Sequence, residues 1–167
     1  MSKPQAGSVA APETISTARW HAMGGFALVG LIAVITGGLV AAATGPTGFT
    51  DGSWVAAYLV LVAGVAQVGL GVGQALLAVV PPSGRRRGWQ LLVYNVANAA
   101  VLLGTLTESV SVVVAGGVLL LLALALFLAA ARHPRTHSWP LAIYRILLAI
   151  LGVSVPVGIV LSALPHS

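Results

Sequence analysis

Hydrophobic residues in this chain gather into long runs instead of short amphipathic patterns. Five such runs cover about residues 22–44, 54–80, 89–107, 110–131 and 140–164. A helix rises about 1.5 Å per residue, so about 20 apolar residues cross the ~30 Å hydrocarbon core of a bilayer. The pattern predicts an all-α fold, a polytopic bundle of five transmembrane helices over residues 19–167.

The breaks between the runs carry residues that end or begin helices. Pro81 cannot continue the second run, and Pro140 is favoured in the first turn of the fifth. Glu108 separates the third run from the fourth and predicts a tight turn. The alternative is one bent helix over residues 89–131, but about 43 residues would extend roughly 65 Å, far beyond the hydrocarbon core. Two spans are therefore preferred there.

The start of the chain differs from the rest. Residues 1–18 are rich in Ser, Ala, Pro and Thr and show no apolar period, so they are predicted to form a disordered cytoplasmic tail. A signal peptide is the alternative interpretation of the first run, because Ala41, Ala42 and Ala43 resemble a cleavage site. Its apolar stretch exceeds the roughly 7 to 15 residues of a signal core, which favours an uncleaved first span.

Basic and acidic residues occupy different connections between the runs. Two of the connections hold only Asp51 and Glu108 as charged residues. The remaining connections and the N-terminal tail carry nearly all the basic residues: Lys3, Arg19, Arg85, Arg86, Arg87, Arg132 and Arg135. Because positive residues are retained on the cytoplasmic side, the N-terminus is predicted to be cytoplasmic and the C-terminus outside.

Composition agrees with a membrane protein. Hydrophobic residues make up 58% of the chain and charged residues 7%, and the mean hydropathy is +1.01. The net charge of +5 does not indicate nucleic-acid binding, because the basic segments are too short to make a binding face. Arg85, Arg86 and Arg87 are instead expected to contact anionic lipid headgroups, at about 1 kcal/mol for each basic residue.

Polar side chains within the spans are the candidate functional residues, because they are costly in lipid unless they face other helices or a cavity. Gln67 and Gln74 share one stripe of the second run, and Asn95 and Asn98 share a stripe of the third. Gln74 and Asn95 each lie about 9 Å from the inner boundary, so antiparallel neighbours would bring them level.

The fifth run adds two polar residues close to its start, Tyr144 and Arg145. The sequence therefore predicts a polar cluster in the cytoplasmic third of the bundle, built from Gln67, Gln74, Asn95, Asn98, Tyr144 and Arg145. One interpretation is that these amides bind helices together, and the other is that they bind a ligand. Arg145 also lies shallow enough to extend its guanidinium to the headgroups.

No cofactor or metal is expected. The chain has no cysteine, which excludes disulfides, thiol catalysis and thiolate metal sites. The histidines stand at span ends, which argues against a haem held between helices. His21, His133 and His137 would make at most a weak metal site without carboxylate support. The acidic residues lie outside the spans, so proton relays, cation coupling and a Ser-His-Asp arrangement lack their usual groups.

Two segments carry a resemblance in style, Tyr58-Leu59-Val60-Leu61-Val62-Ala63-Gly64 and Tyr94-Asn95-Val96-Ala97-Asn98-Ala99-Ala100. Their Ala, Val, Gly and Leu content, with the near absence of Lys, resembles small uncharacterised integral membrane proteins of high-GC actinobacteria. The resemblance extends over most of the chain and includes no diagnostic motif. It implies residence in the plasma (inner) membrane as a multi-pass protein, and it implies no activity.

Three hypotheses for function follow from the sequence. The first is a non-enzymatic membrane component, an accessory subunit or scaffold, which predicts a partner membrane subunit or a homo-oligomer. The second is a carrier or channel for a small neutral or anionic molecule that uses the predicted polar cluster. The third is a membrane enzyme acting on a lipid or quinone-like substrate, for which only Tyr144 or His21 could supply an acid or base.

Overall fold

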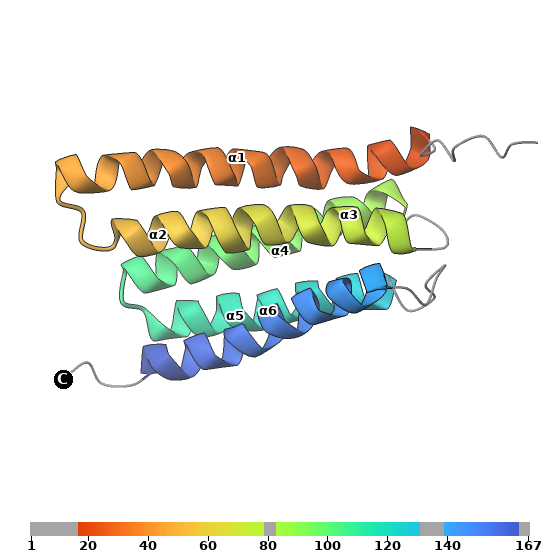
Figure 1. The fold of residues 1–167 in the computed structure, drawn as a ribbon. Helices are drawn as coiled ribbons and strands as arrows, with labels where there is room; N and C mark the ends of the chain where they lie inside the picture. Colours follow the sequence, from red (N-terminus) through yellow and green to blue (C-terminus); the bar gives the residue numbers. More distant parts are fainter. Residues whose placement is uncertain (1–16, 79–82, 131–138, 164–167) are drawn as a thin grey trace, which may run out of the picture.

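The structure, a computed structural model, describes residues 17–78, 83–130 and 139–163, and these residues are helical apart from short turns. The elements are α1 (Thr17–Thr47), α2 (Gly52–Tyr58), the π-helix η1 (Leu59–Ala66), α3 (Gln67–Leu77), α4 (Gly84–Leu106), α5 (Val110–Ala130) and α6 (Trp139–Ala163). The second predicted span is therefore one continuous rod, α2–η1–α3, with a π-helical middle (Figure 1). The prediction of an all-α fold is confirmed for the described residues.

Four helical segments are long and apolar enough to cross a membrane. They are Met23–Thr47, Gly52–Leu77, Gly84–Leu106 and Val110–Ala129. The described part of α6 adds a shorter apolar stretch, Leu141–Val155. Each of the five predicted hydrophobic runs thus corresponds to a helical rod. The predicted tail, residues 1–18, lies outside the described residues except for Thr17 and Ala18, which begin α1.

A boundary difference that affects the candidate site is at α4, which begins at Gly84 and not near Trp89. Ser83 caps this helix, since its hydroxyl accepts a hydrogen bond from the Arg86 N–H at 3.4 Å. Arginine is a good helix former, so the three consecutive arginines extend the helix into the connection. They therefore belong to the first turns of α4, not to a loop as the sequence pattern suggested.

The turn between α4 and α5 is as short as the sequence predicted. α4 ends at Leu106 and α5 begins at Val110. Glu108 adopts the left-handed conformation, with φ of 53°, and the Ser109 N–H donates to the Gly104 carbonyl at 2.8 Å. This hydrogen bond closes the C-terminus of α4.

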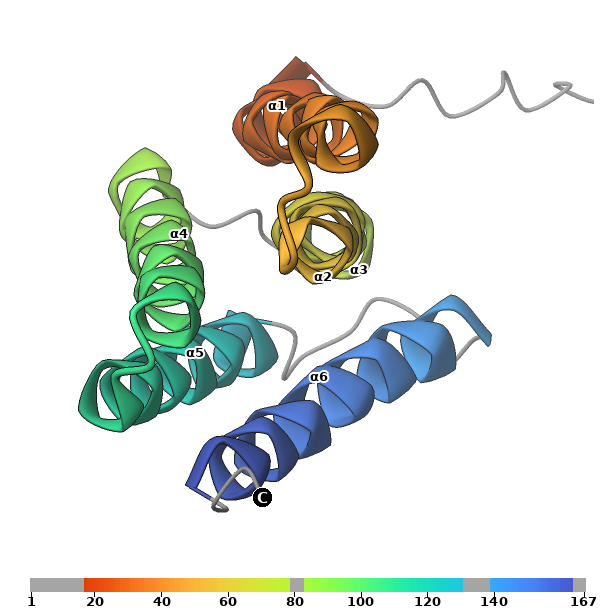
Figure 2. The same cartoon turned by 90° about the vertical axis from the view of Figure 1, so that its left-hand side faces the viewer.

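The rod α2–η1–α3 lies in the middle of the bundle. Viewed end-on, α1 lies on one side of it, α4 on another, and α5 and α6 below (Figure 2). α1 packs along all three parts of this rod, α4 packs on α5, and α6 contacts both α5 and α3. Neighbours in sequence are antiparallel (Figure 1), as short connections require.

Glycines allow the backbones of two of these helix pairs to approach each other closely. A Cβ on Gly30 of α1 would lie 2.9 Å from the Gly64 carbonyl oxygen of η1. A Cβ on Gly104 of α4 would lie 2.7 Å from the Val113 backbone nitrogen of α5. Such close approach through small residues is typical of membrane helices, and here it occurs within one chain.

The centre of the bundle is an aromatic and aliphatic core. The Phe127 ring packs edge-on against Phe26 and Tyr94, with centroids 5.5 and 6.2 Å apart. These three side chains come from α5, α1 and α4, and all are fully buried or nearly so. Phe127 therefore joins α5 to α1 and α4.

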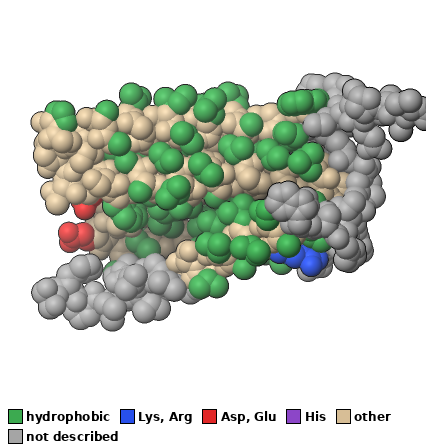
Figure 3. Space-filling model, in the orientation of Figure 1, with side chains coloured by type: hydrophobic (Ala, Val, Ile, Leu, Met, Phe, Trp, Pro, Cys, Tyr) green, Lys and Arg blue, Asp and Glu red, His purple; other side chains and the backbone are tan. Residues whose placement is uncertain are grey.

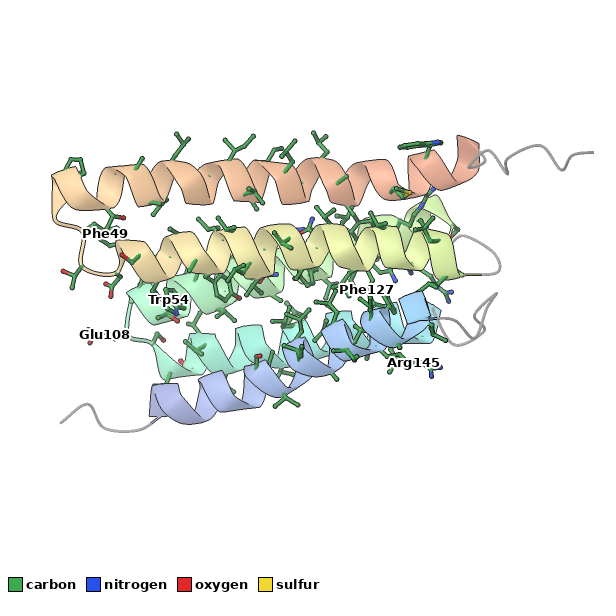
Figure 4. All side chains as sticks on the ribbon, in the orientation of Figure 1. Phe49, Trp54, Glu108, Phe127 and Arg145 are labelled. Atoms are coloured by element: carbon green, nitrogen blue, oxygen red, sulfur yellow. The ribbon has the colours of Figure 1, made fainter. Side chains whose placement is uncertain are left out.

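Large aliphatic side chains cover much of the outer surface (Figure 3). Charged side chains lie toward the two ends. Asp51 and Glu108 lie at the end where α1 meets α2 and α4 meets α5 (Figure 4). Arg85, Arg86, Arg87 and Arg145 lie toward the opposite end. The described bundle is therefore apolar along its sides and charged at its ends, as a lipid environment requires.

Candidate functional site

Two tyrosine hydrogen bonds set the register between α4 and the central rod. The Tyr58 hydroxyl donates to Asn98 Oδ1 at 2.9 Å, and the Tyr94 hydroxyl donates to the Val62 carbonyl at 2.7 Å. The second bond reaches into η1, where the widened turns of a π-helix alter the usual carbonyl pattern. Asn98 therefore lies beside α2, near the end that carries Asp51 and Glu108.

The two asparagines are largely satisfied by their own helix. Asn98 Nδ2 donates to the Tyr94 carbonyl and Asn95 Nδ2 to the Leu91 carbonyl, each at 2.8 Å. Both are bonds to the residue one turn earlier. With its bond from Tyr58, Asn98 joins two helices, which is the binding role that amides commonly have in membrane bundles.

The glutamines differ from the asparagines. Gln67, Gln74 and Gln90 are 0%, 2% and 0% exposed and rank among the largest fully buried side chains of the described residues. The Gln90 amide nitrogen donates to the Leu126 carbonyl at 3.3 Å. Four other buried amide atoms have no hydrogen-bond partner: Gln67 Nε2, Gln67 Oε1, Gln74 Nε2 and Gln90 Oε1. The interior of the bundle thus contains both unpaired amide N–H donors and unpaired amide carbonyl acceptors.

These glutamines lie along the interior of two adjacent rods. Gln67 and Gln74 are two turns apart on one face of α3, with Gly71 between them packed against Phe26. Continuing the register set by Tyr94 and Val62 one turn further along α4 brings Gln90 to the level of Gln67. Gln67, Gln74 and Gln90 are hereafter called the glutamine site.

The two residues of α6 that were predicted to join the polar cluster lie in different environments. Tyr144 is buried, with its ring against Gly73 and its hydroxyl 3.5 Å from the Phe127 carbonyl. Arg145 is exposed and points away from the bundle (Figure 4). Tyr144 therefore belongs to the core near the glutamine site, whereas Arg145 lies outside it.

The expected level match of Gln74 with Asn95 is wrong. Asn95 follows Tyr94, which bonds to Val62, so it lies about three turns away from Gln74 along the central rod. Two boundary differences contribute to the error: α4 begins at Gly84, which places Asn95 deeper, and α3 ends at Leu77, which places Gln74 shallower. Of the six predicted residues, the structure places Gln67, Gln74 and Tyr144 in one region and Asn98 in another.

Gln90 is a site residue that the sequence reasoning missed. It lies within the predicted run 89–107, but it was not among the polar residues singled out there. The sequence does contain a pattern that indicates Gln90 as a buried residue. Gln90, Tyr94 and Asn98 recur every four residues and so lie on one helix face. All three are buried.

The basic residues at the start of α4 form a separate feature. Arg85 and Arg86 are exposed and Arg87 is half-buried, and one buried guanidinium nitrogen of Arg87, Nη1, has no hydrogen-bond partner. The residues considered for a metal site, His133 and His137, lie outside the described residues, as does the side chain of His21. Within the described part of the chain, no group of His, Asp or Glu is placed to hold a metal ion.

Comparison with known proteins adds no further assignment. No protein-family model, no curated protein and no solved structure matches the chain.

Proposed function

We propose that the chain is a five-span protein of the plasma membrane, with its N-terminus in the cytoplasm, that serves as a non-enzymatic accessory subunit or scaffold of a membrane complex. Five apolar helical rods and charges confined to the bundle ends support the span count. The arginines gathered at one end and the carboxylates at the other support the orientation. Anionic headgroups on the cytoplasmic side are the expected partners of Arg85, Arg86 and Arg87.

The observation that carries the proposed role is the surface of α1. This helix packs chiefly against the central rod and presents large aliphatic side chains outward: Leu28, Leu31, Ile32, Ile35 and Leu39. Between α1 and the rod is a groove of about 360 Å³. Its lining is entirely aliphatic and comes from Ala27, Leu31, Val34, Val65 and Val68.

Aliphatic side chains of a partner's transmembrane helix match the chemistry of this groove. Helices in lipid associate through close van der Waals packing, which a ridge of side chains entering an aliphatic groove supplies. Gly30 and Gly64 pack closely where α1 meets η1, the two elements that contribute Leu31 and Val65 to the groove. The proposed role is thus to hold a partner helix along α1 and η1.

Filling the groove is expected to release the partner. Val65 in η1 lines the groove and is 55% exposed, and Val118 in α5 is 51% exposed but lies on another helix. We expect the wild-type chain and the Val118→Trp variant to be recovered with a second polypeptide at fixed stoichiometry, by native mass spectrometry after gentle solubilisation. The Val65→Trp variant should lose it. Recovery of the chain without a partner, or equal recovery from both variants, would contradict the proposed role.

The orientation has its own test, because the chain contains no cysteine. Thr50 lies between α1 and α2 and Ser83 precedes α4, and both side chains are exposed. In intact cells a membrane-impermeant maleimide should label the Thr50→Cys variant, and it should label Ser83→Cys only after the membrane is opened. The reverse pattern would show that the N-terminus is outside.

A second candidate function is a carrier for a small neutral molecule, which the unpaired amides of the glutamine site favour. Arg145 does not take part in it, because this side chain points away from the bundle (Figure 4). Transport would require the occupant of the glutamine site to exchange with both sides of the membrane. Loss of flux in a Gln67→Leu variant that remains folded would support this function over the scaffold.

A further inference from the structure

We propose that Gln67, Gln74 and Gln90 bind small neutral molecules inside the bundle, molecules that both donate and accept hydrogen bonds. Two sources share this chemistry, namely water and small organic amides such as urea or acetamide. The inference rests on the buried amides and is independent of the groove beside α1. It holds whether or not the bound molecule crosses the membrane.

Unpaired amides are costly to bury. An amide removed from water without a partner costs about 1–3 kcal/mol in proteins, and leucine would fill similar space without that cost. Every glutamine in the described part of the chain is nonetheless buried to 2% exposure or less. The asparagines, by contrast, bond to their own helix carbonyls. A bound molecule would supply the partners that the glutamines lack.

The unpaired amide atoms include both hydrogen-bond donors and acceptors. Two are donors, Gln67 Nε2 and Gln74 Nε2, and two are acceptors, Gln67 Oε1 and Gln90 Oε1. A cation would bind acceptors alone, and an anion would bind donors alone. The buried polar side chains of the described core are neutral amides. This balanced set therefore selects a neutral molecule with both functions.

The core around the glutamines limits the size and number of the bound molecules. Gln67 and Gln74 are separated by about 10 Å along α3, and Phe26 fills the space against Gly71 between them. The surrounding core, which includes Leu70, Tyr94 and Phe127, is fully buried or nearly so. We infer two separate positions, one at the level of Gln67 and Gln90 and one at Gln74, and the packed core limits each to a molecule of a few heavy atoms.

Gln67 adds a specific feature to the first position. Its donor and its acceptor are both free, so they present the paired pattern that another primary amide matches with two hydrogen bonds. The Gln90 carbonyl oxygen, at the same level, could accept a third. Water would meet the same atoms with two molecules. Water and a small amide would therefore bind at the same atoms, and the experiment below distinguishes between them.

The test observes the glutamine amides directly. The chain contains four glutamines, at positions 5, 67, 74 and 90, so labelling their side chains with ¹⁵N gives four amide signals. Gln→Met variants at each position assign them, since Met is similar in shape. In lipid nanodiscs we expect the Gln67 and Gln74 amide protons of the wild-type chain to show cross-peaks to long-lived bound water.

Acetamide titration distinguishes the two occupants. A saturable shift of the Gln67 signals that is lost in Gln90→Met and kept in Asn95→Leu would show that the site binds small amides. Water cross-peaks without a saturable shift would show that the occupant is water. Asn95→Leu is the matched control, because Asn95 is half-buried and already bonded to the Leu91 carbonyl.

One result overturns the inference. If the Gln67 and Gln74 amide protons of the wild-type chain show cross-peaks only to protein protons and do not shift with acetamide, the amides have found partners within the chain. The wild-type spectra decide this outcome even if one variant does not fold. Loss of the partner subunit in the Val65→Trp variant would leave these spectra unchanged, so the two proposals fail separately.

Discussion

Replacing Gly30 by alanine is expected to lower the free energy of unfolding by about 1–3 kcal/mol, the usual cost of overpacking a well-packed interface. The added Cβ would lie 2.6 Å from Val68 Cγ2 and 2.9 Å from the Gly64 carbonyl oxygen. The valine could change rotamer, but the carbonyl belongs to the backbone of η1. Helix α1 must therefore move away from the central rod.

Gly38 in the same helix is the matched control. A Cβ there would meet nothing within 4 Å, so alanine adds no clash and removes the conformational freedom that glycine has in the unfolded chain. We expect Gly38→Ala to be stabilising by about 0.5–1 kcal/mol. Unfolding of both variants in mixed micelles, followed by circular dichroism, checks the pair. Equal effects at the two positions would show that α1 does not pack through Gly30.

The Phe127→Ala variant is expected to lose about 3–5 kcal/mol of stability, the range for removing a large aromatic side chain from a core. Phe127 is fully buried, and its ring contacts those of Phe26 and Tyr94. Alanine would leave a cavity where α1, α4 and α5 meet. Aromatic pairs add about 0.5–1.5 kcal/mol beyond the area that they bury, so the loss should be near the upper end.

The adjacent residues on α5 provide the controls for this prediction. Leu126 and Leu128 are 42% and 48% exposed, and lipid or detergent surrounds an exposed leucine as well as it does an alanine. We expect either Leu→Ala change to lower stability by less than about 1 kcal/mol. The same micelle unfolding measurement applies. A loss from Leu126→Ala as large as that from Phe127→Ala would mean that α5 is rotated from the orientation described.

Much of the fold could be predicted from hydrophobicity and helix-breaking residues. The five runs correspond to five helical rods, and the turn at Glu108 lies where predicted. These features are local, because span length and helix ends depend on residues that are neighbours in the sequence. The start of α4 was placed about five residues late, because three consecutive arginines suggested a loop although arginine continues a helix well.

The candidate site was predicted only in part. Gln67 and Gln74 were identified because polar side chains inside an apolar helix must face the interior. Asn95 and Asn98 follow the same rule, yet their amides bond to carbonyls one turn earlier in their own helix. A periodic pattern does not distinguish an amide satisfied by its own helix from one that lacks a partner. Gln90 was missed because its depth depends on where α4 begins.

The sequence by itself therefore determined that the chain forms apolar helices, roughly where each begins and ends, and which end of each carries charge. Only the tertiary structure decided how the helices are rotated and how far each slides along its neighbour. That register depends on contacts between distant residues, such as Tyr58 with Asn98, Tyr94 with Val62 and Gly30 with Gly64. Lipid is as apolar as leucine, so hydrophobicity alone does not select one rotation over another, and small residues and hydrogen bonds must do so.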